Sequence, residues 1–292
     1  MPFWKRDNPG SSCCNCCPCY SLDKGGQTTS GSTDYNLIKK DGGPAASPVK
    51  KLGEGAAGWQ SGVGYLEHAD DTCYSPVQNT DGWAMSFWIK PITNMLVRVC
   101  QPTKPLWRPG VITKGYWEMG LYNNCLAPTQ GSATTHGEWF FVLDRNSESA
   151  TAPVSLIAYI VTNNSPGGSG ATWTFASAGG KILDTRSSTF GTEAAEWNFV
   201  YWYIRNNHSW IVFRGETESS WNLQYQNFNL LGGIKNESVP LRVGTMIEGS
   251  NEYRLGDLGG EYAIDNILFD RDPFTYGSTS SPMPTPEVIP PE

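Results

Sequence analysis

Two groups of acidic residues are the first candidates for chemistry in this sequence. They lie in two short segments: Glu67, Asp70 and Asp71, and Glu248, Glu252 and Asp257. A retaining glycosidase needs an acid and a nucleophile whose carboxyl groups lie about 5–5.5 Å apart, so on a strand the acidic residues should alternate on one face. Neither group has a Glu-x-Asp-x-x-Glu spacing. The sequence therefore does not predict a glycan-cleaving site.

Four of the acidic side chains are candidates for binding Ca²⁺. Asp70 and Asp71 follow an expected strand, and Asp257 and Glu261 flank a Gly-rich turn. Calcium takes carboxylate, carbonyl and water oxygens as ligands, and these positions supply carboxylates. We expect a calcium site if the two turns share one rim of the fold. The alternative is ordinary turn chemistry and solubility.

Four tryptophans are candidates for gripping a sugar ring. They lie in Gly-, Pro- or Ser-rich surroundings that predict loops: Trp59, Trp107, Trp173 and Trp221. An exposed indole packs well against the apolar face of a sugar, while amides and carboxylates satisfy the hydroxyls. The alternative for each tryptophan is that it closes an open end of the fold as part of the core.

Five of the eight cysteines fall within seven residues near the start of the chain: Cys13, Cys14, Cys16, Cys17 and Cys19. Crowded thiols can ligate a metal, accept lipids or form disulfide bonds with another chain. The segment lacks the spaced pairs of a closed zinc site. We expect it to attach the chain to other protein chains, and the alternative is a tail without function.

The remaining enzyme signatures are weak. His68, His136 and His208 lie far apart in the sequence, and no Gly-x-Ser-x-Gly nucleophile motif is present. We expect each histidine to be a satisfied or exposed loop residue.

The composition restricts the class of protein. The chain has 292 residues with 12 Trp, 13 Tyr and 11 Phe for a core, and 32 Gly and 20 Pro for turns. This balance favours β structure over helices. A net charge of -7 makes a nucleic acid an unfavourable partner. No apolar run is long enough to cross a membrane, and no apolar stretch follows the basic residues at the start, so a conventional secretory signal is not expected.

The strand at residues 83–91 indicates the kind of fold that positions these residues. Trp83, Met85, Phe87 and Ile89 alternate with Ala84, Ser86, Trp88 and Lys90, and Pro91 removes a donor and ends the strand. We expect the first set in the core and Trp88 and Lys90 on the second face. Further strands are expected at residues 139–143, 154–160, 197–204, 210–213, 241–244 and 262–269. Short strands joined by Gly-rich turns predict two packed antiparallel sheets.

Composition also divides the chain. Residues 1–54 are rich in Cys, Gly, Ser and Pro and are expected to form a flexible tail that buries little apolar area. Residues 55–276 have the composition of one domain, and residues 277–292 form a Pro-rich tail.

The order of the strands resembles the concanavalin A-like lectin/glucanase superfamily, in its laminin-G-like or pentraxin-like branch. The similar motifs are Ser-Phe-Trp-Ile-Lys-Pro at residues 86–91, Trp-Asn-Phe-Val at 197–200, and the closing strand at 260–269 that contains Asp265. The strand at 210–215 departs from the family pattern, because Arg214 stands where the family usually has Asp. The face on which Asp265 lies is not fixed by the sequence.

The resemblance implies a jelly-roll sandwich, and in many relatives Ca²⁺ at a rim of it. The superfamily contains lectins, glycanases, adhesive modules and virion proteins, so it does not by itself give a function. We expect a non-catalytic module that binds a glycan or a host surface, in a setting such as a phage or virus particle. The alternatives are a glycan-cleaving enzyme of the same fold and a structural subunit without a small ligand.

Overall fold

The computed structural model of the protein describes its strands and the turns next to them. The described residues are 19–20, 22, 37–47, 51, 55–60, 63–76, 83–91, 110–116, 136–145, 154–162, 172–175, 197–205, 208–215, 222–229, 238–248, 251–254 and 262–270. A search of these residues for helices finds none with the length and apolar character that crossing a membrane requires.

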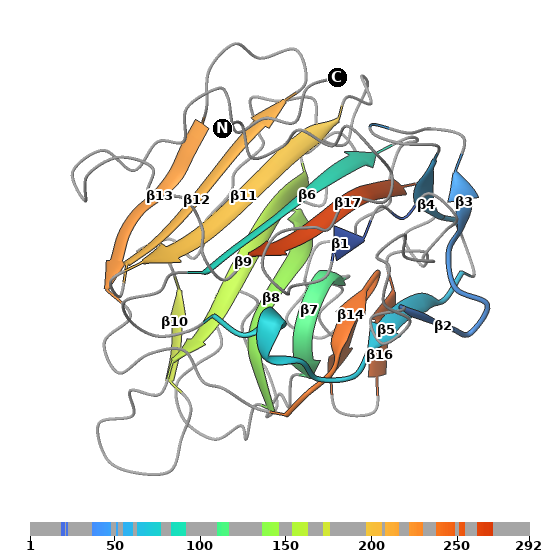
Figure 1. The fold of residues 1–292 in the computed structure, drawn as a ribbon, viewed down its shortest axis with the longest axis horizontal. Coiled ribbons are helices and arrows are strands. Elements are labelled where there is room, and N and C mark those ends of the chain that lie inside the picture. The colour runs from blue at the N-terminus through green and yellow to red at the C-terminus, as the bar shows by residue number, and fades with distance from the viewer. Residues whose placement is uncertain are drawn as a thin grey trace.

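One sheet has eight strands and occupies the upper part of Figure 1. Its order is β13-β12-β11-β6-β17-β4-β3, and β1 also pairs with β17. The bounds are β13 (Asn222–Asn229), β12 (His208–Gly215), β11 (Asn198–Arg205), β6 (Trp83–Pro91), β17 (Tyr262–Asp270), β4 (Ala56–Trp59), β3 (Ala45–Ser47) and β1 (Cys19–Tyr20).

The second sheet has seven strands in the order β10-β9-β8-β7-β14-β5-β2. Its bounds are β10 (Thr172–Phe175), β9 (Val154–Thr162), β8 (His136–Arg145), β7 (Gly110–Tyr116), β14 (Leu241–Val243), β5 (Tyr65–His68) and β2 (Ile38–Lys40). A separate ribbon pairs β15 (Thr245–Glu248) with β16 (Asn251–Arg254), and a 3-10 turn, η3, spans Thr72–Tyr74.

Every strand pairing among the described residues is antiparallel, and this part of the chain is nearly all β. The predicted all-β fold of two packed antiparallel sheets is therefore confirmed. A tight hairpin joins β11 to β12, because Arg205 of β11 lies opposite His208 of β12.

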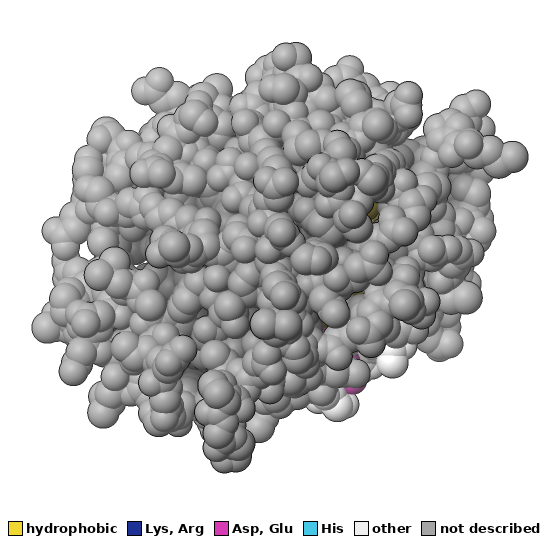
Figure 2. Space-filling model, turned by 90° about the vertical axis from the view of Figure 1, so that its left-hand side faces the viewer, with side chains coloured by type: hydrophobic (Ala, Val, Ile, Leu, Met, Phe, Trp, Pro, Cys, Tyr) yellow, Lys and Arg dark blue, Asp and Glu magenta, His cyan; other side chains and the backbone are white. Residues whose placement is uncertain are grey.

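The core lies between the two sheets and is built from alternating strand residues. Trp83, Met85, Phe87 and Ile89 of β6 all belong to it, as the period of two predicts. Rings from both sheets meet there: the ring centroids of Trp83 and Trp202 are 4.7 Å apart, and those of Trp139 and Trp202 are 5.7 Å apart. Few atoms of the described side chains are visible on the molecular face that Figure 2 shows.

The expectation that residues 1–54 bury little apolar area is wrong for several positions. Tyr20, Leu22 and Leu37 are buried and belong to the core cluster. β1 pairs with β17, β2 with β5 and β3 with β4. These short strands supply hydrogen-bond partners to neighbouring strands, a gain that local composition does not show.

Candidate functional site

The eight-stranded sheet carries a set of aromatic and polar side chains on the face turned away from the core. We call Ser86, Trp88, Phe199, Tyr201 and Asp265 the outer-face patch. Trp88 lies opposite Phe199 of β11 and opposite Asp265 of β17, and Ser86 lies opposite Tyr201. Their neighbours along β6 point into the core, so these alternate positions point away from it. All five side chains are buried.

The aromatic half of the patch is a continuous row of rings. The ring centroids of Trp88 and Phe199 are 4.9 Å apart in a tilted contact, and Phe199 and Tyr201 stack with an interplanar angle of 12°. Because the rings come from neighbouring positions on β6 and β11, the sheet itself sets their spacing. They form a platform of packed rings that is buried in this structure.

The polar half of the patch has hydrogen-bonding capacity that the protein does not use. Among the described side chains, the Ser86 Oγ and the Trp88 Nε1 are buried and have no hydrogen-bond partner. A buried donor or acceptor left in this way costs about 1–3 kcal/mol, so such groups are rare in folded proteins and call for a physical reason.

A β-bulge in β17 adjoins the patch. Asp265 pairs with Trp88 and Leu268 with Ser86, so Asn266 and Ile267 together stand opposite the single residue Phe87. Asn266 has a φ of 49°, which is left-handed backbone, and its Oδ1 is another buried oxygen without a partner among the described atoms. Bulges and left-handed residues of this kind are enriched beside functional sites.

Two lysines place ammonium groups over indole rings on this face. The Lys51 Nζ lies 4.9 Å from the Trp88 ring centroid, and the Lys90 Nζ lies 5.9 Å from that of Trp197. The backbone N–H of Lys51 also donates to the Asp265 Oδ2 over 3.0 Å. Residue 51 therefore touches both an aromatic and an acidic member of the patch.

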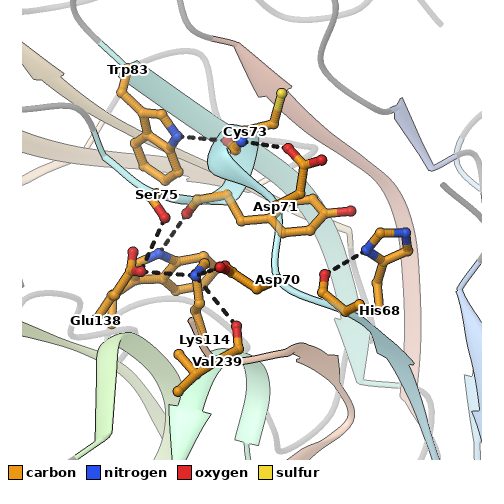
Figure 3. A network of polar contacts seen from close by, with 12 residues as sticks. His68, Asp70, Asp71, Cys73, Ser75, Trp83, Lys114, Glu138 and Val239 are labelled. Atoms are coloured by element: carbon orange, nitrogen blue, oxygen red, sulfur yellow. Dashed lines mark hydrogen bonds and ion pairs between the residues drawn. The ribbon is translucent and has the colours of Figure 1, made fainter. Parts of the chain in front are cut away.

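A second polar network, drawn in Figure 3, joins the strands of the seven-stranded sheet to the segment after β5. The ammonium of Lys114 (β7) is fully buried and contacts the Glu138 Oε1 at 2.8 Å and the Asp70 Oδ1 at 2.6 Å. The Ser75 hydroxyl donates to the same Glu138 oxygen at 3.0 Å. The network thus fixes residues 70–75 on β7 and β8.

Three acidic residues near β5 make contacts that stabilise the fold. Asp71 caps η3 by accepting the N–H of Cys73 over 2.7 Å, and Glu67 forms an ion pair with Arg242 at 2.9 Å. Asp70 is held by Lys114. Buried or partly buried ion pairs of this kind lock elements together because losing one partner leaves the other charge uncompensated.

This arrangement bears on the predicted calcium ligands. Asp70 has a cation on its Oδ1 and Asp71 uses its Oδ1 as a cap, and the role of either residue as a calcium ligand stays a prediction. In the described part of the chain, no group of three or more His, Cys, Asp or Glu residues could hold a metal. Asp257 and Glu261 lie outside the described residues.

The predicted loop position of Trp59 is wrong. Trp59 belongs to β4, its side chain is fully buried, and its Nε1 donates to the Gly64 carbonyl over 3.1 Å. Gly244 makes room for the ring: a Cβ at that glycine would meet the Trp59 Nε1 at 2.1 Å. Trp59 is therefore a core residue and does not present its ring to a ligand.

The other predicted positions have mixed outcomes. Trp173 lies in strand β10, not in a loop, and Trp107 and Trp221 lie outside the described residues. His68 is a buried strand residue whose Nδ1 lies 2.7 Å from the Ala69 carbonyl oxygen.

Cys19 is the one residue of the cysteine cluster that the structure describes. The backbone of Cys19 lies opposite Leu268 in the pairing of β1 with β17, and the remaining cysteines of the cluster lie outside the described residues: Cys13, Cys14, Cys16 and Cys17. Cys73, outside the cluster, is disulfide-bonded. The attachment role of the cluster stays a prediction.

Sequence reasoning missed the outer-face patch as a site, although a signal was present. The alternation of β6 places Trp88 and Ser86 on the second face, and the confirmed position of Trp88 shows that this part of the prediction is correct. The facing residues Phe199 and Tyr201 become visible only when β6 and β11 are known to be neighbours. The outward position of Asp265 likewise depends on its register with Trp88.

The fold and the patch define the class of the protein as a two-sheet antiparallel β-sandwich. No protein-family model matches the sequence, and no curated protein matches it either. Solved structures with a similar fold include a binding domain of botulinum neurotoxin DC in complex with "SialylT" (12% identity, TM-score 0.45) and one in complex with rat synaptotagmin II (10% identity, TM-score 0.44).

These two matches cover 85% and 82% of this chain, but the chain spans only 45% and 44% of the toxin chains. An exolytic alginate lyase from Zobellia galactanivorans is also similar, at 11% identity and a TM-score of 0.38, over 80% of this chain and 88% of the lyase.

Proposed function

We propose that the protein is a non-catalytic glycan-binding module of the concanavalin A-like type, with the outer-face patch as its binding site. The observation that carries the proposal is the combination of a ring platform with the unused Ser86 Oγ and Trp88 Nε1. A sugar presents an apolar face to aromatic rings and hydroxyls that both donate and accept hydrogen bonds. The patch offers a partner for each of these features.

The number of carboxylates in the outer-face patch favours a binding site over a glycan-cleaving site. Among its described residues the patch holds one carboxylate, that of Asp265, whereas glycoside hydrolysis normally uses two that flank the bond. The acidic residues near β5 lie on another part of the fold, where Lys114, Arg242 and the N–H of Cys73 engage them. We therefore assign no acid–base pair among the residues that the structure describes.

A structural subunit without a ligand is the second candidate, and one observation favours it. All five side chains of the patch are at most 5% exposed, as expected of a second, smaller core. In that case the Ser86 and Trp88 groups are a cost of packing and nothing binds to them. The two candidates make opposite predictions for glycan binding.

A glycan array, run with and without Ca²⁺, tests the proposal. The wild-type protein is expected to bind at least one glycan class, and Ser86→Ala is expected to weaken that binding about three- to tenfold, the value of one hydrogen bond. Lys39→Ala, an exposed position on β2, is the matched control and is expected to bind as wild type. Absence of binding under both conditions would establish the structural-subunit reading.

Two finer predictions from the sequence accompany the proposal. Calcium binding that involves Asp257 and Glu261 predicts a titration signal with Ca²⁺ that Asp257→Asn abolishes. A role on the surface of a phage or virus particle, attached through the cysteine segment, predicts cross-linking to another chain that a reducing agent reverses.

A further inference from the structure

Cys73 is disulfide-bonded, and its surroundings limit which of the remaining cysteines is its partner. It lies in the middle of η3, is 4% exposed and belongs to the core cluster. Bridged cysteines have Cα atoms within about 7 Å of each other, so the partner belongs to a segment that comes close to η3. The sequence offers three such segments: the cysteine cluster at residues 13–19, the one around Cys100 and the one around Cys125.

The cysteine cluster ends beside η3. The hydroxyl of Tyr74 in η3 hydrogen-bonds with that of Tyr20, and the Tyr74 and Phe269 ring centroids are 4.9 Å apart. Phe269 follows Leu268, which lies opposite Cys19 where β1 pairs with β17. No cysteine of the cluster precedes Cys19 by more than six residues. The whole cluster is therefore within reach of η3.

The segment around Cys100 begins far from Cys73. The Cys73 carbonyl accepts the Trp83 Nε1–H over 3.0 Å, which places η3 at the start of β6. Cys100 follows the other end of that strand, nine residues after Pro91. A strand of nine residues is about 26 Å long, so this segment would have to run back along the whole of β6 to reach η3. Cys100 is therefore poorly placed as the partner.

The segment around Cys125 begins near η3, but on the side from which the sulfur points away. It joins the end of β7 to the start of β8, the two strands that carry the Lys114–Glu138 ion pair. Figure 3 shows the Cys73 Sγ pointing away from this ion pair of the seven-stranded sheet. The N-terminal segment instead pairs with β17 of the eight-stranded sheet. The direction of the sulfur therefore favours the cluster over Cys125.

We infer that the disulfide bond of Cys73 joins η3 to a cysteine of the N-terminal cluster within the same chain. The bond holds the cluster on the sandwich, where β1 supplies only two residues of strand pairing. It leaves the other four cluster cysteines for the proposed attachment to other chains. A pull on such an attachment then reaches η3 through covalent bonds, and the Asp70–Lys114 ion pair holds this part of the chain on β7. The inference does not depend on glycan binding.

Peptide mapping tests the inference, because trypsin separates the candidate cysteines. Cleavage after Lys and Arg, except before Pro, gives one peptide for each candidate: 7–24 with the cluster, 52–98 with Cys73, 99–114 with Cys100 and 115–145 with Cys125. Free thiols of the isolated monomer are blocked in denaturant at acidic pH, and the unreduced digest is analysed by mass spectrometry. The expected product is peptide 52–98 bridged to peptide 7–24, and reduction with a phosphine should separate the two.

Two sets of variants accompany the map. Cys100→Ser and Cys125→Ser are the matched controls, and each is expected to keep the bridge between the Cys73 peptide and the cluster peptide. Serine at all five cluster positions is expected to leave Cys73 open to maleimide once the chain is unfolded. A Cys73 peptide that is unbridged in the wild type, or bridged to Cys100, to Cys125 or to a second copy of itself, overturns the inference. Each of these outcomes leaves the proposed function standing.

Discussion

At the scale of single residues, two tryptophans of β6 have the same chemistry and opposite surroundings. Trp83 lies in the core, where its Nε1 donates to the Cys73 carbonyl over 3.0 Å. Trp88 lies on the outer face, where its Nε1 has no partner among the described atoms. The Trp83 indole N–H therefore stabilises the core, whereas the Trp88 indole N–H is the one that the proposed binding site uses.

Replacing each tryptophan by phenylalanine tests this separation. Trp83→Phe leaves the Cys73 carbonyl without its donor and shrinks a core ring, so it is expected to lower the free energy of unfolding by about 2–4 kcal/mol. Trp88→Phe also shrinks a buried ring, but it removes an N–H that has no partner, so it is expected to cost less, about 1–2 kcal/mol.

Glycan affinity should respond in the opposite order. Trp88→Phe keeps a ring but loses the N–H, and a weakening of about three- to tenfold is expected. Urea unfolding followed by tryptophan fluorescence measures the first quantity and calorimetry the second. A loss of stability in Trp88→Phe as large as that in Trp83→Phe would show that Trp88 is held as firmly as a core residue, and would count against the outer-face patch as a binding site.

At the scale of elements, the register of β17 determines the face of the sheet on which Asp265 lies. Before the bulge, β17 pairs with β4 through residues 262–264, and after it β17 pairs with β1 through residues 267–268. Asp265 and Asn266 fall between these two pairings. The bulge lets Ile264 and Ile267 both enter the core while Asp265 faces outward beside Trp88.

Substitutions at Asn266 test the role of the bulge. Glycine suits a positive φ, so Asn266→Gly is expected to change the free energy of unfolding by less than about 0.5 kcal/mol. Asn266→Val forces a β-branched residue into left-handed backbone and is expected to cost about 1–3 kcal/mol. Chemical unfolding of the two variants compares them directly. Equal stability of both would mean that the backbone at 266 is not left-handed in solution.

The elements also show how far sequence reasoning reaches. Strands with clean alternation or long apolar runs were predictable: β6 matches its expected bounds, and β11 and β17 differ from theirs by a single residue or two. The bulge was not predictable, because one extra residue changes the register without changing the apolar pattern around it. The outward position of Asp265 follows from that register, so the sequence alone could not predict that Asp265 belongs to the site.

At the scale of the whole molecule, the sandwich depends on contacts between segments far apart in the chain. Trp59 enters the core because Gly244 leaves space for it, and Lys114 is buried because Glu138 and Asp70 meet it from different segments. The amino-acid composition around a residue does not show which distant segments the residue contacts. The loop position assigned to Trp59 and the tail assigned to residues 1–54 failed for this reason.

The N-terminal segment gives the sharpest test at this scale. Tyr20 is fully buried, lies opposite Ile267 in the pairing of β1 with β17, and its hydroxyl hydrogen-bonds with that of Tyr74. Tyr20→Ala is therefore expected to lower the free energy of unfolding by about 3–5 kcal/mol, as for other large aromatic residues removed from a core. A residue in a solvated tail would change stability by less than about 0.5 kcal/mol.

Tyr20→Phe is the matched variant, since it keeps the ring and removes only the hydroxyl. It is expected to cost about 1–2 kcal/mol, mainly through the lost hydrogen bond to Tyr74. Thermal and urea unfolding of the two variants, with the wild type, give both values. If Tyr20→Ala unfolds at the same urea concentration as the wild type, β1 does not add to the sheet in solution, and the edge of β17 beside the bulge is open to another strand.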